Sequence, residues 1–214
     1  MMKKTAMKAL LGAVAAIAVS ASAAAAQEVT LRMHQFLPGA ANVPSLILDR
    51  WADAVEADSN GRIKIERYNA MALGGTPPEL MDQVLDGIAD IIWTVNGYTP
   101  GRFPRTEVFE LPFFVSNPRA ASAALWTMYE NEMQQDFAGV RQLGMWVHGP
   151  GMIHTSTPVA APEDLRGMKI RGGSRMVNDL LTQLGAEPVG LPVTGIPEAL
   201  SRGVIDGTTI PWEV

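Results

Sequence analysis

The sequence predicts an α/β fold in which helices cover a parallel sheet. Three strand-like segments, 29–36, 63–66 and 91–95, are separated by two helical segments. The first two alternate apolar and polar residues, and the third is almost wholly apolar, as is typical of a strand covered on both faces. Because parallel neighbours need a long crossover between them, the order strand, helix, strand, helix, strand favours a parallel sheet.

The two helices of this half carry recognisable start and stop signals. We expect Asn42 to cap the first helix and Asn60-Gly61 to end it. Thr76 and Glu79 have the spacing of a capping box at the start of the second. Apolar residues recur at helical spacing along the first helix, and we expect them to be buried. They are Val43, Leu46, Ile47, Trp51, Ala54 and Val55.

The middle of the chain continues the alternation and then loses it. Asn117-Pro118 predicts the start of a helix that runs to about Gln135, and the pattern of 141–147 predicts a further strand. Proline and glycine then punctuate 150–162, which we interpret as a linker. We therefore expect a first α/β lobe over 27–150 and a partial second α/β lobe over 151–214.

The last part of the chain is again predicted to alternate strands and helices. Segment 168–171 alternates as a strand, Ser174 is placed to cap a helix over 175–184, and Pro197 starts another helix. Segment 207–211 predicts a strand entering the core. Since the chain stops directly after it, we expect that a remainder of this lobe is missing.

The first 26 residues predict export from the cytoplasm. Three lysines precede an uncharged apolar stretch, and Ala24-Ala25-Ala26 supplies small residues for signal peptidase. The apolar stretch is about half the roughly 20 residues that a spanning helix needs. We therefore expect a signal peptide over 1–26, cleaved before Gln27, and a periplasmic mature chain.

Composition excludes several classes of function. Removing the three lysines of the leader lowers the formal net charge from −5 to −8, so no basic footprint for nucleic acid is present. There are 0 cysteines, which excludes disulfides and thiolate chemistry. His34, His148 and His154 are scattered without metal-binding spacing. We expect no metal, no cofactor and no nucleic-acid partner.

Catalytic motifs are equally scarce. The sequence has no G-x-S-x-G elbow, no phosphate-binding loop and no G-x-G-x-x-G. Glu107 with Glu110, or Asp86 with Asp90, could be taken for paired carboxylates, but Asp86 and Asp90 are more simply the solvated end of a helix. We expect no catalytic residue, and a periplasmic hydrolase stays only as an alternative.

Arg171 is the candidate ligand-binding residue that the pattern itself singles out. It stands at the carboxyl end of a predicted strand, before Gly172-Gly173 and a helix N-terminus. In open α/β sheets, ligands bind outside the carboxyl ends of strands, and helix N-termini favour anions. A guanidinium can hold a carboxylate through two parallel hydrogen bonds. The alternative is an ordinary surface arginine.

Several segments resemble the substrate-binding subunits of tripartite ATP-independent periplasmic (TRAP) transporters. They occur in the family's order at 59–65 with 73–75, at 109–113, at 162–171 and at 198–207. The most specific of them reads Pro-Glu-Asp-Leu-Arg-Gly-Met-Lys-Ile-Arg and ends on Arg171. With the order of elements, the resemblance covers nearly all of 29–214.

This resemblance implies a two-lobed, venus-flytrap binding protein whose second lobe is incomplete here, since members normally have roughly 300 residues. It also implies that Arg171 pairs with the carboxylate of a small organic acid, and that the partners are the small and large membrane subunits of the transporter. A binding protein of an ATP-driven importer, and a nonfunctional remnant, stay open as alternatives.

The resemblance places further residues around the ligand. By approximate alignment, these positions are mostly apolar, which suits a monocarboxylate with an apolar or aromatic body. That they are simply core residues is an equally good interpretation. The polar candidates, at strand ends, are His34, Gln35 and Asn96, and the apolar candidates are Phe36, Val95, Tyr98, Trp146, Gly151, Ile210 and Trp212.

Overall fold

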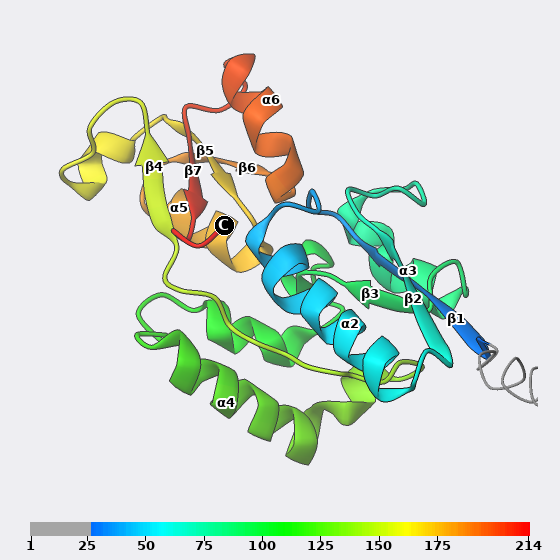
Figure 1. Ribbon diagram of the computed structural model, residues 1–214. Coiled ribbons are helices and arrows are strands. Elements are labelled where there is room, and N and C mark those ends of the chain that lie inside the picture. Colours follow the sequence, from blue (N-terminus) through cyan, green and yellow to red (C-terminus); the bar gives the residue numbers. More distant parts are fainter. Residues whose placement is uncertain (1–26) are drawn as a thin grey trace, which may run out of the picture.

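The computed structural model describes residues 27–214 and contains two sheets (Figure 1). The first sheet is parallel and has the order β2-β1-β3. Its strands are β1 (Val29–Gln35), β2 (Ile63–Tyr68) and β3 (Ile91–Trp93). The predicted parallel α/β arrangement of this half is confirmed.

The second sheet has the order β4-β7-β5-β6 and is mixed. Strand β5 pairs in parallel with β6 and β7, whereas β4 pairs with β7 in antiparallel register. The strands are β4 (Met152–Thr155), β5 (Lys169–Gly172), β6 (Glu187–Gly190) and β7 (Gly207–Ile210). We call the elements that precede residue 138 the first lobe and those from β4 to β7 the second lobe.

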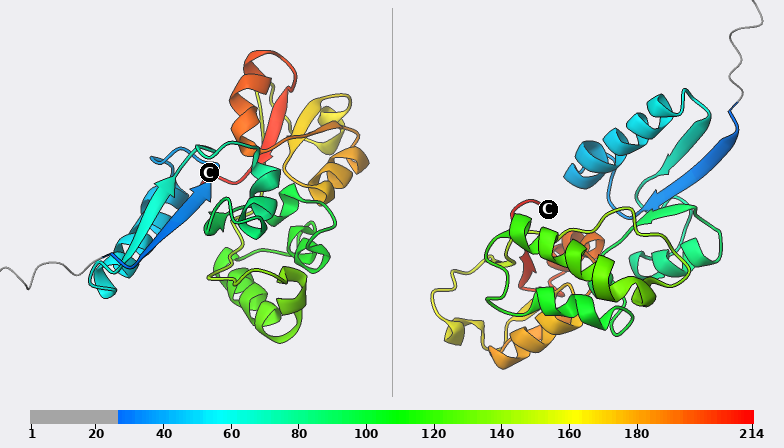
Figure 2. Two further views of the ribbon diagram at one scale, coloured as in Figure 1. Left: turned by 90° about the vertical axis from the view of Figure 1, so that its right-hand side faces the viewer. Right: turned by 90° about the horizontal axis from the view of Figure 1, so that it is seen from below.

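Helices flank both sheets, and Figure 2 shows the two lobes side by side from two further directions. The first lobe contains η1 (Pro44–Leu48), α2 (Asp49–Asp58), η2 (Pro77–Glu79), α3 (Leu80–Leu85), η3 (Asn96–Tyr98), η4 (Pro104–Glu110), α4 (Pro118–Met128), η5 (Tyr129–Met133) and η6 (Gln134–Phe137). The second lobe contains η7 (Pro162–Leu165), α5 (Arg175–Gln183), η8 (Val193–Gly195) and α6 (Ile196–Ser201).

The first helix differs from its prediction in two respects. Its contact with the sheet is made by the fully buried Ala52, while Trp51 is 36% exposed and Leu46 and Ile47 are more so. The expected burial of the whole apolar stripe is therefore wrong. Because Ala52 is small, the helix packs closely on the sheet through the face that carries Ala52, which lies next to the predicted stripe. Asn42 does not cap this helix either; its side chain instead donates to the carbonyl of Glu213, 3.0 Å away.

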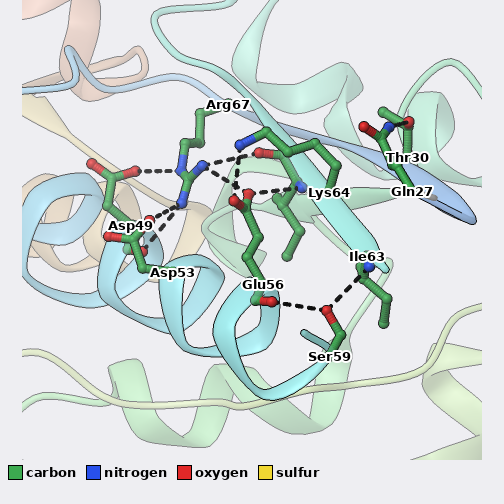
Figure 3. Close-up of polar contacts among 10 residues, drawn as sticks. Gln27, Thr30, Asp49, Asp53, Glu56, Ser59, Ile63, Lys64 and Arg67 are labelled. Atoms are coloured by element: carbon green, nitrogen blue, oxygen red, sulfur yellow. Dashed lines mark hydrogen bonds and ion pairs between the residues drawn. The ribbon is translucent and has the colours of Figure 1, made fainter. Parts of the chain in front are cut away.

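An ion-pair cluster joins this helix to strand β2 (Figure 3). Arg67 pairs with three acids of α2, namely Asp49, Asp53 and Glu56. Glu56 also accepts from Lys64 Nζ at 2.8 Å and from a backbone N–H of β2. Because one arginine serves three carboxylates, the cluster fixes the helix in one orientation on the sheet.

Two expectations for the middle of the chain are corrected. Segment 141–147 forms no strand, because its backbone meets a helix and no sheet edge: the Val147 N–H donates to the Ser122 hydroxyl of α4 at 2.9 Å. The expected linker 150–162 contains β4, whose partner β7 lies more than 50 residues further along the chain. Strand β6 is a further correction, because no strand was predicted at this position.

Most predicted helix starts are confirmed. Asn117 accepts from the Ala120 N–H, and Ser174 accepts from the Val177 N–H. At Thr76, the Glu79 carboxylate accepts from both the backbone N–H and the hydroxyl. The expected signal peptide lies outside the described residues, and none of the helices over 27–214 is long and apolar enough to cross a membrane.

Each lobe has its own apolar core. The described part of the first lobe holds one cluster around Met133 and Phe137 and another around Ala52 and Ile65. The second lobe holds clusters around Ile170 and Ile196. No buried cluster over 27–214 mixes residues of the two lobes, so their contact relies on polar groups and does not share a core.

Candidate functional site

The candidate site lies where the strands of the two sheets end. Strand β1 leads into Phe36, β3 leads into η3, and β5 ends at Arg171-Gly172. Because these strands run in parallel, their carboxyl ends lie on one edge of each sheet, the usual position of ligands in such folds.

Arg171 is a buried cation of the second lobe. It is 4% exposed, and its Nε and Nη1 donate to the carbonyls of Leu191 and Thr209 at 2.7 and 3.1 Å. Burial lowers its pKa, because the charged form loses hydration. Among residues 27–214, no carboxylate forms an ion pair with it. Two carbonyl dipoles compensate the charge only in part, so the guanidinium can still take an anion.

Gly173 packs closely against this guanidinium. A β-carbon at this position would lie 3.1 to 3.3 Å from the two terminal nitrogens and the central carbon of Arg171. Such distances are shorter than ordinary van der Waals contact, so a larger residue would press on the arginine. The lack of a side chain at Gly173 therefore leaves the guanidinium of Arg171 the room that it occupies.

Tyr98 reaches the same place from the first lobe. Its hydroxyl oxygen accepts a hydrogen bond from the backbone N–H of Val193, 3.0 Å away in the second lobe. Val193 follows Leu191, whose carbonyl binds Arg171, and the Tyr98 hydroxyl lies beside the guanidinium, where it raises the pKa of Arg171 against the effect of burial. Tyr98 and Arg171 thus meet on one short segment of chain.

Aromatic rings extend from Tyr98 along the edge of the first sheet. Phe36 lies 5.5 Å from Tyr98 and stacks on Trp93 at 4.8 Å between ring centroids. Trp93 in turn stacks on Trp146 at 6.1 Å. The structure therefore brings Phe36, Tyr98 and Trp146 together in one aromatic column, which meets Arg171 at Tyr98.

Trp93 is the member of this column that sequence reasoning missed. It ends β3 and pairs in register with Gln35, directly before Phe36. An aromatic residue at the carboxyl end of a parallel strand was a usable signal. The apolar run 91–95, however, predicts the same residue to be sheet core.

His34 and Gln35 are tied to the first lobe. His34 is fully buried; its Nδ1 bonds the Gln83 side chain at 2.7 Å, and its Nε2 accepts from the Leu73 N–H. Burial lowers its pKa, which favours the neutral ring that this pattern requires. Gln35 donates to the Leu37 carbonyl and the Asn69 side chain. Both residues hold loops behind the column, so the structure does not bring their polar atoms to Arg171.

The remaining candidates are distributed around the edge. Val95 and the half-buried Asn96 start η3, and Ile210 ends β7 and packs in the core beside Ile196. Gly151 is exposed, and a β-carbon on it would meet nothing within 4 Å. Trp212 is 77% exposed and packs edge-on against His154. Their part in ligand binding stays a prediction.

The lobes also touch where η4 meets the start of α5. The Glu107 carboxylate pairs with Arg175, and Glu110 lies beside Ser174. Burial is the main cause that raises the pKa of Glu110, and one of its carboxyl oxygens has no hydrogen-bond partner in the described part of the chain. The two acids that could be mistaken for a catalytic pair thus form part of the contact between the lobes.

A separate groove lies away from Arg171. An apolar groove of about 530 Å³ runs between residues 108–117 and helix α4. It contains no charged lining residue, so it offers no cation to pair with a carboxylate. We therefore place the candidate site at Arg171. No group of three or more possible metal ligands occurs within 27–214.

The model of the family described as "Bacterial extracellular solute-binding protein, family 7" matches residues 40–214. The chain belongs to this family, the solute-binding proteins of TRAP transporters. Its membership confirms the resemblance found in the sequence and the two-lobed α/β fold. The family and its solved members are binding proteins, and the curated members include periplasmic binding proteins.

Two solved structures are particularly similar. A TRAP solute-binding protein from Rhodoferax ferrireducens T118, in complex with copurified benzoate, is 48% identical with a TM-score of 0.84 and covers 86% of this chain. A marine metagenome TRAP protein described as specific for aromatic acids, with 3-hydroxybenzoate, is 48% identical with a TM-score of 0.85 and covers 88%. A curated solute-binding protein from Albidiferax ferrireducens is 30% identical over 203 residues, or 92% of this chain.

The chain is shorter than these relatives. It spans 58% and 59% of the two solved chains and 60% of the curated protein. The described residues therefore correspond to the first lobe and part of the second lobe of the family fold.

Proposed function

We propose that this chain captures an aromatic monocarboxylate in the periplasm and delivers it to the small and large membrane subunits of a TRAP transporter. The observation that carries the proposal is the buried Arg171, which has no anionic partner among residues 27–214 and stands beside an aromatic column. The signal peptide over 1–26 would supply the export that this role requires.

The charge of Arg171 determines the ligand's head group. A buried guanidinium that bonds only carbonyls gains most from an anion, and its forked donors match a carboxylate. Removing one partner of such a buried charged pair costs about 2–5 kcal/mol, so the arginine should account for a large part of the affinity.

The aromatic column determines the ligand's body. Phe36, Trp93 and Trp146 stack on one another and make this wall apolar and uncharged, so the wall favours a flat apolar group over a second carboxylate or a sugar. The two similar structures with benzoate and 3-hydroxybenzoate support this class of ligand. The family and its solved members are described as solute-binding proteins, and we assign no catalytic step to the chain.

A thermal-shift titration tests the proposal. The purified chain is titrated with benzoate, 3-hydroxybenzoate, mandelate, succinate and a sialic acid, and each mixture is then analysed by chromatography. A ligand that binds only the native state raises the melting temperature by mass action. We expect the three aromatic acids to raise it and to be recovered unchanged. A response confined to succinate or the sialic acid would contradict the assigned class, and product formation would contradict the binding role.

A further inference from the structure

Tyr98 is the only described residue of the first lobe whose hydroxyl accepts a backbone N–H from the second lobe. The bond joins the end of η3 to the start of η8, 95 residues apart in the chain. The ring of Tyr98 is held by Phe36 in the first lobe. The hydroxyl is therefore positioned by one lobe and engaged by the other.

The hydroxyl and the guanidinium of Arg171 converge on segment 191–193. Arg171 Nε donates to the carbonyl of Leu191, and the N–H of Val193 donates to Tyr98. Since the two bonded backbone groups are only two residues apart, the polar ends of the two side chains lie next to each other. An anion that meets one of them is within reach of the other.

The hydrogen-bond inventory of Tyr98 leaves its proton free. A phenol hydroxyl has one donor and can accept as well. Its oxygen accepts from Val193, and nothing in the described part of the chain accepts its O–H. On the Arg171 side, no carbonyl or carboxylate over 27–214 accepts from Nη2. The free O–H of Tyr98 thus stands beside the guanidinium edge of Arg171 that no carbonyl or carboxylate over 27–214 takes up.

Building on the proposed function, we propose that Tyr98 is a second carboxylate ligand of this site and links anion capture to lobe closure. The O–H of Tyr98 donates to one oxygen of the carboxylate that Arg171 holds, while the Tyr98 oxygen keeps the Val193 N–H. A bound carboxylate accepts hydrogen bonds from donors of both lobes at once. An open arrangement would lose both the Val193 bond and the contact with the ligand.

Tyr98→Phe tests this role, because it removes the hydroxyl and keeps the ring on Phe36. Tyr68→Phe is the matched control, since the Tyr68 hydroxyl donates to the Glu66 carboxylate of the same strand. Calorimetry with benzoate gives the affinity, and carbon NMR of carboxyl-labelled benzoate reports hydrogen bonding at the bound carboxylate. Melting of the free chains shows whether the variants fold.

We expect Tyr98→Phe to weaken benzoate binding roughly ten- to hundred-fold, as for a lost hydrogen bond to a charged group, and to move the carboxyl resonance. Tyr68→Phe should leave both unchanged. Wild-type affinity in Tyr98→Phe, or weaker binding with an unmoved resonance, would overturn the inference alone. Failure of the unmodified chain to bind benzoate would overturn the proposed function and the inference together.

Discussion

Gly97 of the first lobe and Ser174 of the second lobe approach so closely that a β-carbon on Gly97 would lie 2.7 Å from the β-carbon of Ser174. The same atom would lie 2.8 Å from a carboxyl oxygen of Glu110. Gly97 directly precedes Tyr98, so this close contact between the lobes is adjacent to a candidate ligand-binding residue. This geometry makes the separation of the lobes sensitive to a single methyl group.

Gly97→Ala should act as a wedge. The added methyl cannot fit without moving the lobes apart, so we expect benzoate to bind at least tenfold more weakly, although no ligand contact is removed. Calorimetry measures the affinity. Gly144→Ala is the control, because a β-carbon there meets nothing within 4 Å. Equal affinities of the two variants would contradict the close approach of the lobes.

Glu110→Gln should change the dependence of stability on pH. The pKa of Glu110 is raised, chiefly by burial, with Glu107 adding to the effect and His148 and Arg175 opposing it. For an acid with a raised pKa, the native state loses stability as pH rises through the folded value, because the buried carboxyl must ionise. The neutral amide of the variant does not ionise, so the variant does not lose stability in this way as pH rises.

We therefore expect Glu110→Gln to melt at a higher temperature than the unmodified chain at pH 8, with the difference vanishing below pH 4.5, the ordinary value for this group. Melting curves from pH 4 to 8 measure it, with the exposed Glu163→Gln as control. A difference that grows toward low pH would show that the sign is wrong.

Glu56→Gln should have the opposite pH dependence. The hydrogen bond from Lys64, followed by the Ile65 N–H, lowers the pKa of Glu56 to about 2. A lowered pKa contributes stability that is present above the ordinary value and is lost as pH falls through the folded one. We expect the variant to melt at a lower temperature at pH 7 and to approach the unmodified chain between pH 4.5 and 2. A constant difference over this window would contradict the assignment.

The elements that local sequence determines were predicted well. The caps at Asn117 and Ser174 and the parallel order of the first sheet depend on neighbouring residues, and the structure has them. Strand β4 was missed because its stability comes from pairing with β7, more than 50 residues away. Segment 141–147 alternates like a strand, yet its nearest polar partner is a serine of helix α4.

The candidate site was predicted in part for the same reason. Arg171 could be found because a cation at a strand end before a Gly-Gly turn is a local signal. His34 stands at a strand end too, but its partners Gln83 and Leu73 come from other segments, which only the fold brings together. The hydrogen bond between Tyr98 and Val193 spans 95 residues and has no counterpart in the sequence pattern.

The most direct test of the account is the affinity of Arg171→Lys for benzoate, measured by calorimetry beside the unmodified chain and the exposed Arg119→Lys. Lysine keeps the charge but lacks the planar fork and cannot bond the Leu191 and Thr209 carbonyls in the same geometry. We predict about 30-fold weaker binding or worse for Arg171→Lys and no change for Arg119→Lys. Full affinity in Arg171→Lys would contradict the central claim that this guanidinium holds the carboxylate.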